Sequence, residues 1–383
     1  MQELEAQRNL ELMWLTGRLA PDFKTIANFR KDNGPAIRKV CRQFIDLCRG
    51  LGLFSQGLVA VDGSKFKAVN NRDKNFTSAK MQRRMTMIEE SISSYLTALD
   101  SADRAEPEIA GLQEQMAKLK AIEQRLLASP DHQVSLTDPD ARSMKSRDGG
   151  IVGYNVQCAV EAQNHLIVAH EVVTEGIDRD LLTSMAEQAR EAMGQEDLTA
   201  VADRGYYKGE EILKCEQTGI TPIVPKSLTS NNRAHGLFDK QDFIYVAADD
   251  EYRCPANQRA IWRFTTVERG MNLRRYWSSA CPRCPIKAQC TRSDYRRITR
   301  WEHEQVLDAM QERLDRHPEM MRIRRRTVEH PFGTLKHWMG WTHFLMKRLP
   351  NVKTEMSLHV LAYNLKRAMQ IFGVPELLQA LHA

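Results

Sequence analysis

Helical patterns of apolar and polar positions fill the first 50 residues of the chain. Two amphipathic stretches cover residues 21–49, and turns are predicted at residues 20–22 and 32–34. Many cations lie among the apolar positions of residues 21–49. A basic helix–turn–helix can lie against a phosphate backbone, but the same pattern suits the solvated face of a structural helical bundle. No capping signal precedes Leu4, so we expect that upstream sequence is missing.

Two short apolar runs each lead to an aspartate that a glycine soon follows. One is Leu58-Val-Ala-Val-Asp62-Gly, and the other is Leu198-Thr-Ala-Val-Ala-Asp203-Arg-Gly. Such runs are typical of buried strands, and an aspartate that ends a strand lies at the rim of an α/β sheet. A lone aspartate in this place can instead cap the next helix. Two such strands favour a pair of carboxylates that share a divalent cation such as Mg²⁺.

The order of the neighbouring elements predicts the fold class. Residues 153–161 and 166–173 have the pattern of a β-hairpin, residues 178–193 that of an amphipathic helix, and residues 221–224 that of a last strand. Without an inserted arm, the order is βββαβαβ, the connectivity of the ribonuclease H-like fold. We therefore expect an α/β protein with a ribonuclease H-like mixed sheet and flanking helices. Its first and fourth strands would lie side by side and bring Asp62 and Asp203 together.

A charged, helix-forming segment at residues 76–130 reads as an inserted helical arm. Apolar residues from Ile109 to Leu126 recur at three- and four-residue spacing, as in a helical hairpin or a short coiled coil. Residues 137–147, which follow the arm, read as a polar turn rich in cations.

Four of the eight cysteines lie in a second insertion, residues 226–300. Cys281 and Cys284 form a C-x2-C pair, Cys290 follows, and Cys254 lies upstream without a near partner. Four thiolates suit a tetrahedral, structural Zn²⁺ ion, although a reduced thiol cluster without metal also fits. The segment interleaves arginines with aromatic residues, as a nucleic-acid surface or a half-buried β subdomain does. The other four cysteines stand singly among apolar neighbours and are expected to be core thiols, at Cys41, Cys48, Cys158 and Cys215.

A third acidic position follows a helix predicted over residues 301–326. Arg325, Glu329 and Lys336 are spaced so that one helical face can carry all three, although Pro331 either kinks this helix or begins a new one. An Arg–Glu pair at this spacing is also ordinary chemistry of a surface helix.

The length and net charge of the chain are compatible with these predictions but do not by themselves require them. The chain has 383 residues, enough for two or three domains, and a net charge of +6 that permits a nucleic-acid partner. It contains no apolar run of about 18 or more residues and no basic-then-apolar leader, so we expect a soluble, intracellular protein without membrane contact.

Taken together, these residues resemble the bacterial insertion-sequence transposases of the DDE class. The resemblance covers most of the chain and depends on the spaced triad Asp62, Asp203 and Glu329, on Arg325 and Lys336, on the cysteine cluster, and on five further motifs. These are Asp62-Gly-Ser-Lys65, Asp138-Pro-Asp-Ala-Arg142, Gly153-Tyr-Asn-Val-Gln157, Ala202-Asp-Arg-Gly-Tyr-Tyr207 and Val328-Glu-His-Pro-Phe-Gly333.

The resemblance implies a reaction and a set of site residues. Asp62, Asp203 and Glu329 would be catalytic and would hold two Mg²⁺ (or Mn²⁺) ions. Water would cut the DNA at the ends of the element, and the freed 3′-hydroxyl would attack target DNA. The residues expected to bind DNA phosphates are Arg325, Lys336, Lys65 and Arg204. The partners would be double-stranded DNA, as terminal inverted repeats and target, and a second copy of the chain. The expected location is the bacterial cytoplasm, at the nucleoid.

Two departures from the family pattern bear on activity. Many relatives have a tyrosine three residues before the arginine, where this chain has Arg322, and their amino-terminal helical region is longer. The alternative function is therefore a catalytically impaired, truncated remnant that binds DNA as a repressor. A nuclease for RNA–DNA hybrids is a third reading, for which the arm and the Cys-rich insertion have no obvious use.

The sequence also predicts domain borders. Residues 1–57 would form a helical, DNA-binding region, and residues 58–350 a catalytic domain interrupted by the arm at 76–130 and the Cys-rich insertion at 226–300. Residues 351–383 would be helices that pack on the core.

Overall fold

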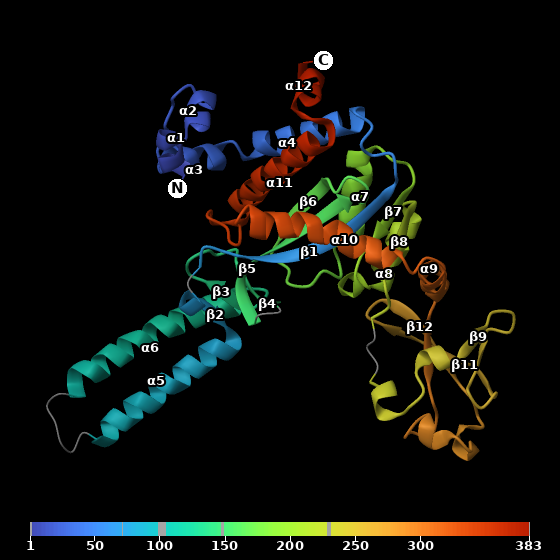
Figure 1. The fold of residues 1–383 in the computed structure, drawn as a ribbon. Helices are drawn as coiled ribbons and strands as arrows, with labels where there is room; N and C mark the ends of the chain where they lie inside the picture. The colour runs from blue at the N-terminus through green and yellow to red at the C-terminus, as the bar shows by residue number, and fades with distance from the viewer. Residues whose placement is uncertain (1, 71, 99–104, 147–148, 228–230, 383) are drawn as a thin grey trace. The chain divides into compact units, whose positions relative to one another are not determined.

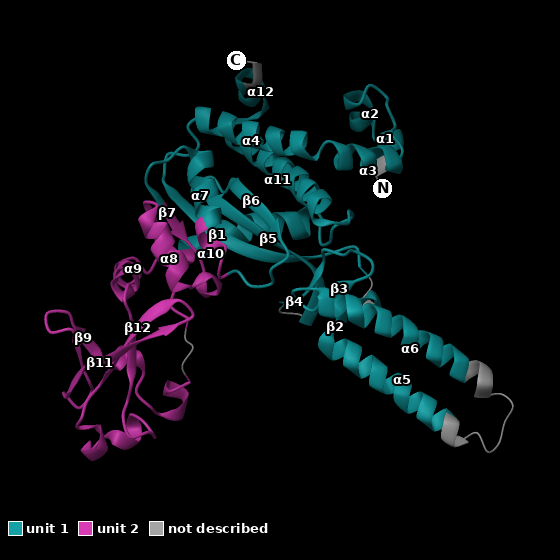
Figure 2. Cartoon of the chain, turned by 180° about the vertical axis from the view of Figure 1, so that it is seen from behind, with its two compact units in different colours: residues 1–178, 184–198, 323–383 teal, residues 179–183, 199–322 magenta. Residues whose placement is uncertain are grey.

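The computed structural model describes residues 2–70, 72–98, 105–146, 149–227 and 231–382. The chain folds into two compact units, which are coloured separately in Figure 2. Unit 1 comprises Met1–Asp178, Ser184–Leu198 and Ile323–Ala383, and unit 2 comprises Arg179–Thr183 and Thr199–Arg322. Both units contain helices and strands, so the predicted α/β class is confirmed.

Unit 1 contains an antiparallel arrangement of strands around β5 (Gly149–Glu161). Along one edge β5 pairs with β1 (Leu58–Lys67). Along the other edge it pairs with β4 (Arg142–Ser146) near its start and with β6 (Ile167–Val173) near its end. The predicted hairpin of β5 and β6 is confirmed. Strand β4 lies where the sequence predicts a polar turn, so that prediction is wrong for these residues.

Strand β1 does not end at Asp62, as the sequence predicts, but continues to Lys67. Side chains alternate between the two faces of a strand, so Ser64 and Phe66 follow Asp62 on one face. Phe66 lies opposite Tyr154 of β5, and both rings are fully buried. Burial of this aromatic pair explains why the strand extends past its apolar run.

Two helices cover the face of the sheet on which Asp62 lies. They are α10 (Met320–Gly333) and α11 (Leu349–Phe372), and Figure 1 shows both beside β1 and β5. Their apolar side chains form one core with those of the strands, and the members include Ala60, Phe66, Tyr154, Cys158, Val328, Phe332, Met356 and Tyr363. This burial is the main force that holds α10 against β1.

The remaining helices of unit 1 are α1 (Gln2–Arg8), α2 (Leu10–Leu15), α3 (Phe23–Asp32), α4 (Gly34–Gly50), α7 (Leu182–Met193) and α12 (Val374–His382). The four amino-terminal helices confirm the predicted helices and turns of this region. Helix α4 packs on α11, and Gly34 permits the close approach, because a Cβ there would lie 2.6 Å from Thr354 Oγ1.

The predicted arm is a helical hairpin of α5 (Ser78–Ala98) and α6 (Ala105–Ala128). At its base, β2 (Asn75–Thr77) pairs with β3 (Gln133–Ser135). The described core of the arm contains Phe76, Met81, Leu119, Leu126 and Val134. The predicted apolar stripe therefore packs inside the hairpin.

Two carboxylates of the Asp138-Pro-Asp-Ala-Arg142 motif hold the start of α11. Asp138 Oδ1 accepts the backbone N–H of Arg348 at 3.0 Å, and Asp140 Oδ2 accepts that of Leu349 at 2.8 Å. Asp138 is fully buried and also accepts the Tyr154 hydroxyl at 2.8 Å. These bonds satisfy backbone donors that a helix leaves unpaired at its first turn.

Unit 2 combines a small α/β part with the Cys-rich insertion. The first part has β7 (Leu198–Val201) next to β8 (Ile220–Ile223), with α8 (Gly209–Gln217) between them in sequence and α9 (Glu304–Arg316) after the insertion. The insertion is a five-stranded antiparallel sheet of order β13-β12-β11-β10-β9. Its strands are β9 (Ile244–Val246), β10 (Glu251–Arg253), β11 (Arg259–Glu268), β12 (Met271–Trp277) and β13 (Ile298–Trp301).

The single helix predicted over residues 301–326 is wrong. Trp301 belongs to β13, and two helices, α9 and α10, follow it. Pro318 lies between them, where a residue without a backbone N–H interrupts the helical pattern. No helix in the described part of the chain is long and apolar enough to cross a membrane.

Candidate active site

Asp62 lies in the middle of β1, opposite Cys158 of β5. Its Oδ1 accepts the backbone N–H of Gly63 at 2.9 Å. The same oxygen lies 2.6 Å from Nη2 of Arg324, which comes from α10. A half-buried carboxylate therefore faces a cation across the interface between the strand and the helix.

The rotation of α10 decides which of its polar side chains face β1. Its buried positions are Thr327, Val328, Pro331 and Phe332. Arg324 precedes Val328 by one turn and so lies on this buried side, whereas Arg325 and Glu329 are exposed. In the part of the chain that the structure describes, Arg325 and Glu329 do not pair with each other.

Helix α10 continues through Pro331 to Gly333 and then changes to a π-helical turn, Thr334–Trp338. A π-helix has more residues per turn, so the spacing from Glu329 to Lys336 no longer places both on one face. Lys336 is turned toward β1: its Nζ donates to Ser64 Oγ at 2.7 Å and to the carbonyl of Lys65 at 3.3 Å. The predicted common face of Arg325, Glu329 and Lys336 is therefore not present.

Burial lowers the pKa of the Lys336 ammonium, and the nearby Asp62 carboxylate opposes that shift. The ammonium also lies 4.4 Å from the centre of the Phe66 ring. Asp62, Arg324 and Lys336 thus form one mixed-charge cluster on β1. Lys65, one residue from Ser64, points to the opposite face, where its Nζ donates to the carbonyl of Lys145 at 2.7 Å.

Asp203 belongs to unit 2 and follows β7 by two residues. Its Oδ1 accepts the backbone N–H of Gly205 at 2.7 Å and caps a short 3-10 turn, Arg204–Tyr206. This capping role is the alternative that the sequence left open for a lone aspartate after a strand. Arg204 is exposed in the same turn.

As they stand, no three His, Cys, Asp or Glu side chains of the described residues are placed to hold a metal ion. The structure brings together Asp62, Lys336 and Arg324, of which the sequence reasoning named the first two. Arg324 was missed because it stands in a run of arginines, Arg322-Ile-Arg-Arg-Arg326. Only its position, one helical turn before the buried and apolar Val328, distinguishes Arg324 from the neighbouring arginines.

Asp178 is a second residue that the sequence reasoning missed. Asn155 Nδ2 and Gln157 Nε2 each donate to Asp178 Oδ1 at 2.7 Å. These three side chains lie against Gly63: a Cβ there would come 2.3 Å from Gln157 Nε2 and 2.7 Å from Asp178 Oδ1. The glycine next to Asp62 therefore makes room for a carboxylate on the opposite face of β1.

The motif Val328-Glu-His-Pro-Phe-Gly333 is mostly structural. Val328, Pro331 and Phe332 are buried, and His330 Nδ1 lies 2.8 Å from the Tyr363 hydroxyl. Glu329 stands out because it is an exposed carboxylate between buried residues. Packing does not account for it.

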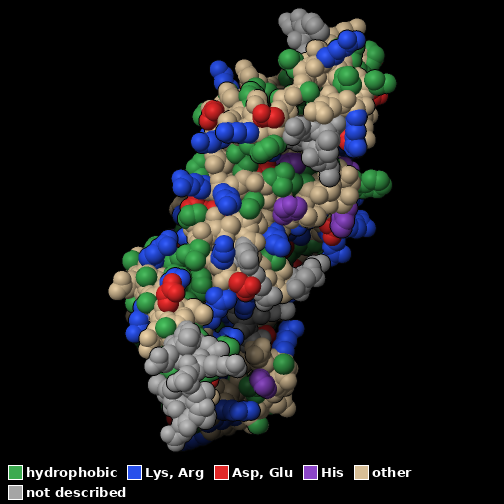
Figure 3. Space-filling model, turned by 90° about the vertical axis from the view of Figure 1, so that its left-hand side faces the viewer, with side chains coloured by type: hydrophobic (Ala, Val, Ile, Leu, Met, Phe, Trp, Pro, Cys, Tyr) green, Lys and Arg blue, Asp and Glu red, His purple; other side chains and the backbone are tan. Residues whose placement is uncertain are grey.

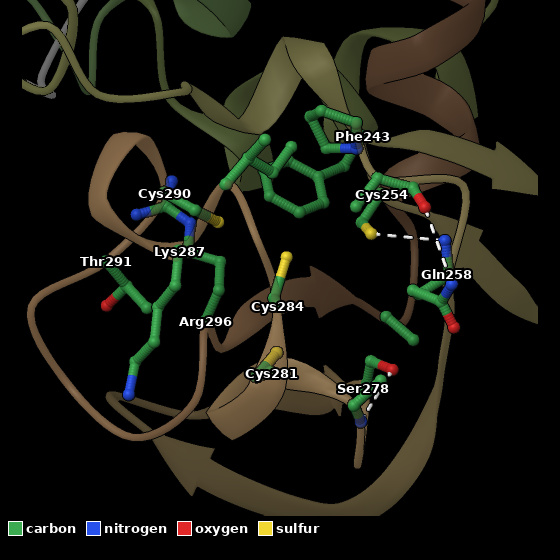
Figure 4. Close-up of a pocket in the computed structure, with 15 residues that line it drawn as sticks. Phe243, Cys254, Gln258, Ser278, Cys281, Cys284, Lys287, Cys290, Thr291 and Arg296 are labelled. Carbon is green, nitrogen blue, oxygen red and sulfur yellow. Dashed lines mark hydrogen bonds between the residues drawn. The ribbon is translucent and has the colours of Figure 1, made fainter.

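The four clustered cysteines line one pocket of unit 2 (Figure 4). Burial raises the pKa of the Cys290 thiol, and the Arg296 guanidinium opposes that shift, while Cys281, Cys254 and Cys284 raise the pKa further. The four single cysteines, Cys41, Cys48, Cys158 and Cys215, are buried, as predicted.

Basic side chains are spread over the surface. Figure 3 shows Lys and Arg in blue across the face in view, with fewer Asp and Glu in red. This agrees with the net charge of +6 and suits a polyanionic partner.

Comparison with known families assigns the carboxyl-terminal part of the chain. Residues 253–369 match the family model described as "Transposase DDE domain". The matched stretch contains the cysteine cluster, Arg324, Glu329 and Lys336, while Asp62 and Asp203 precede it. No curated protein matches the chain. The match supports the assignment of this chain to the DDE-class transposases.

Proposed function

We propose that this transposase cuts DNA at the ends of a bacterial insertion sequence and joins the freed 3′ ends to target DNA. The observation that carries the proposal is the cluster on β1, where Asp62 lies beside the cations of Arg324 and Lys336. The helix that supplies Arg324 also carries Glu329, an exposed carboxylate without a packing role. Carboxylates and phosphate-binding cations on one strand–helix pair suit phosphodiester chemistry.

Asp62, Asp203 and Glu329 would hold Mg²⁺ or Mn²⁺, as two ions. The donor set fits, because carboxylate oxygens are the ligands these hard cations prefer, and Asp62 already faces a guanidinium cation. When bound, the ions would activate the attacking oxygen and stabilise the leaving oxygen of the phosphodiester. This role also requires the ribonuclease H-like core, in which β1 and the strand before Asp203 are neighbours.

The bonds balance without an external energy source. In the first reaction, water attacks the phosphorus at the end of the element, the P–O3′ bond breaks, and a 3′-hydroxyl is released. In the second, that hydroxyl attacks a target phosphodiester, so one P–O bond forms while another breaks. Two element ends must be joined, so we propose that two copies of the chain act together on DNA at the bacterial nucleoid.

The cations near these carboxylates would bind the DNA backbone. Arg325 is exposed on α10 and can donate two hydrogen bonds to one phosphate, whereas Lys336 acts as a point charge beside Asp62. Arg204 would serve the same purpose beside Asp203. Lys65 lies on the other face of β1, so it would contact a different part of the DNA.

The test is strand cleavage of labelled DNA. This DNA carries the two terminal repeats that flank the gene for this chain, one at each end of the element. Wild-type and Glu329→Gln chains are compared with Mg²⁺, Mn²⁺ and EDTA. We expect metal-dependent nicking at the repeat boundary that the Glu329→Gln change abolishes. Asp62→Asn and Asp203→Asn should behave alike. Normal nicking by Asp203→Asn would refute the carboxylate assignment.

The alternative function is a DNA-binding repressor without catalysis. Binding of the same DNA by the wild-type chain, with no cleavage in either metal, would favour it over the transposition reaction. Cleavage of an RNA–DNA hybrid in place of the element ends would instead indicate a ribonuclease.

A further inference from the structure

Cys254 is distant in sequence from Cys281, Cys284 and Cys290, and all four meet in unit 2. Cys254 follows β10, Cys281 and Cys284 lie in a turn after β12, and Cys290 follows a second turn. All four line the same pocket, and Figure 4 shows the sulfurs of Cys254, Cys284 and Cys290 pointing toward its middle. The fold, rather than sequence proximity, brings Cys254 to the other three.

The pocket is small. Its cavity volume is about 30 Å³, which is room for a few atoms. The rest of the wall includes the apolar Phe243, Ala260 and Ile286 and the cations of Lys287 and Arg296, none of which is a metal ligand. Its other polar side chains, from Gln258, Ser278 and Thr291, offer neutral oxygens, which suit zinc less well than thiolates do. The sulfurs are therefore the ligand atoms best placed to hold a single ion there.

The turn at Cys254 is built around its sulfur. The backbone N–H of Gln258 points at Cys254 Sγ at 3.3 Å, and the N–H of Cys254 donates to the carbonyl of Gln258 at 3.0 Å. Asn257 adopts a φ of 55°, which closes the turn.

The hydrophobic core of the insertion is small. Its described core consists of Phe243, Tyr252, Ala260, Tyr276 and Ile298. Cys254 and Cys290 pack directly on that core. Small modules with cores of this size commonly need a metal or a disulfide to fix their loops. All four cysteines are free thiols in the structure.

We propose that Cys254, Cys281, Cys284 and Cys290 bind one structural Zn²⁺ ion, which fastens the turns of the insertion to its five-stranded sheet. As they stand, the four sulfurs are not gathered closely enough to hold an ion. Binding of the ion would require them to converge by rotation about the Cα–Cβ bond, the one torsion that moves a cysteine sulfur. Four thiolates in tetrahedral arrangement select zinc or iron, and zinc needs no redox partner. This site is separate from the carboxylates proposed for DNA cleavage.

The first test is the metal content of the full-length chain, purified without added metal or chelator. We expect about one zinc per chain, released when the thiols are titrated with an organomercurial. Cobalt added after zinc removal should give the visible and near-ultraviolet absorption of thiolate–cobalt bonds. Neither measurement needs a variant or an active transposase.

Variants then locate the site. Cys281→Ser and Cys254→Ser should each lower zinc content and allow alkylation of the remaining three cysteines. Cys215→Ser, which changes a buried thiol in the same unit, should leave zinc content unchanged. Because serine at a ligand position could unfold the insertion, alkylation of the wild-type chain with and without a zinc chelator is compared as well.

Three outcomes would overturn the proposal. They are a chain without zinc whose clustered thiols react equally with and without chelator, a Cys281–Cys284 disulfide found by mass spectrometry, and a chain that carries iron in place of zinc.

Discussion

Nη2 of Arg324 lies 2.6 Å from Oδ1 of Asp62, and the two residues are separated by most of the chain. The side chains are 14% and 23% exposed, so water screens the pair only in part. A divalent cation on Asp62 would have to share this oxygen with the guanidinium or displace it. On the proposed function, Arg324 and a metal ion would therefore compete for the same carboxylate.

This competition predicts that Arg324→Gln increases the affinity for Mn²⁺. Loss of a cation worth up to about 1.4 kcal/mol at this oxygen corresponds to a gain of up to about tenfold in affinity. The dissociation constant is measured on the full chain by the electron paramagnetic resonance of free Mn²⁺. Arg325→Gln changes an exposed neighbour and should have no such effect. Weaker Mn²⁺ binding by Arg324→Gln would mean that Arg324 orients Asp62 and does not compete with the metal.

Lys336 should contribute to DNA binding in a pH-dependent way. Burial lowers its pKa more than Asp62 raises it, so its charge is lost at a lower pH than that of an ordinary lysine. We expect Lys336→Gln to weaken DNA binding at neutral pH and to differ less from the wild type as the pH rises toward about 10.4, the pKa of an ordinary lysine. Arginine stays charged over this pH range, so the DNA affinity of Lys336→Arg should stay above that of Lys336→Gln. The measurement is fluorescence anisotropy of element-end DNA; a wild-type advantage that is constant with pH would contradict the prediction.

Asp138 should matter for stability and not for chemistry. Asp138→Ala leaves the buried Tyr154 hydroxyl and the Arg348 N–H without this acceptor, and we expect a loss of about 2–4 kcal/mol in the free energy of unfolding. Asp140→Ala removes the acceptor of the Leu349 N–H alone and should cost about 1 kcal/mol. Urea denaturation measures both. Equal losses of unfolding free energy in the two variants would contradict the prediction, because the buried bond between Asp138 and Tyr154 would then add no stability beyond the cap of α11.

Acid should destabilise unit 1 through two half-buried histidines. Burial, with Arg38 adding to it, lowers the pKa of His170 to about 4, and burial lowers that of His359 to about 4 as well. A neutral histidine in the folded state gives stability that is present above the unfolded pKa near 6.5 and is lost as the pH falls toward 4. Each such histidine contributes a slope of about 1.4 kcal/mol per pH unit in that window.

His170→Gln removes one of these titrating groups. The free energy of unfolding should then fall less steeply as the pH decreases, by about 1.4 kcal/mol per pH unit. Glutamine can still bond to Ser357 Oγ, which lies 2.9 Å from His170 Nε2. The free energy of unfolding is measured by urea titration between about pH 7.5 and 5. His317→Gln, at an exposed position, is the control. An unchanged slope in His170→Gln would place the acid sensitivity elsewhere.

Some motifs of the chain serve packing and others serve chemistry, and their amino-acid sequences alone do not show which. In Gly153-Tyr-Asn-Val-Gln157, the glycine has no room for a Cβ, which would lie 2.0 Å from the carbonyl oxygen of Phe66. The tyrosine bonds to Asp138, and the two amides hold Asp178. The motif is therefore a structural support for β1, and Asp62 depends on it indirectly.

Local patterns in the sequence were sufficient for most of the secondary structure. The amino-terminal helices, the arm, the hairpin of β5 and β6, and β7 and β8 follow from apolar spacing and turn residues, because each depends on neighbours a few positions away. The cysteine cluster and the three candidate carboxylates were also evident as residue types. Predictions failed where the deciding contact was distant, as in the extension of β1 through the burial of Phe66 by Tyr154.

The sequence by itself determined which residues carry charge, thiol and carboxylate chemistry, and which segments fold as helices or strands. The tertiary structure alone decided that Arg324, and not Arg325, faces Asp62, and that Lys336 reaches Ser64 across 272 residues of sequence. It also decided that Cys254 joins the other three cysteines in one pocket. The physical reason is that these relationships depend on the rotation of α10, the π-helical turn after it and the packing of distant segments, which no local pattern encodes.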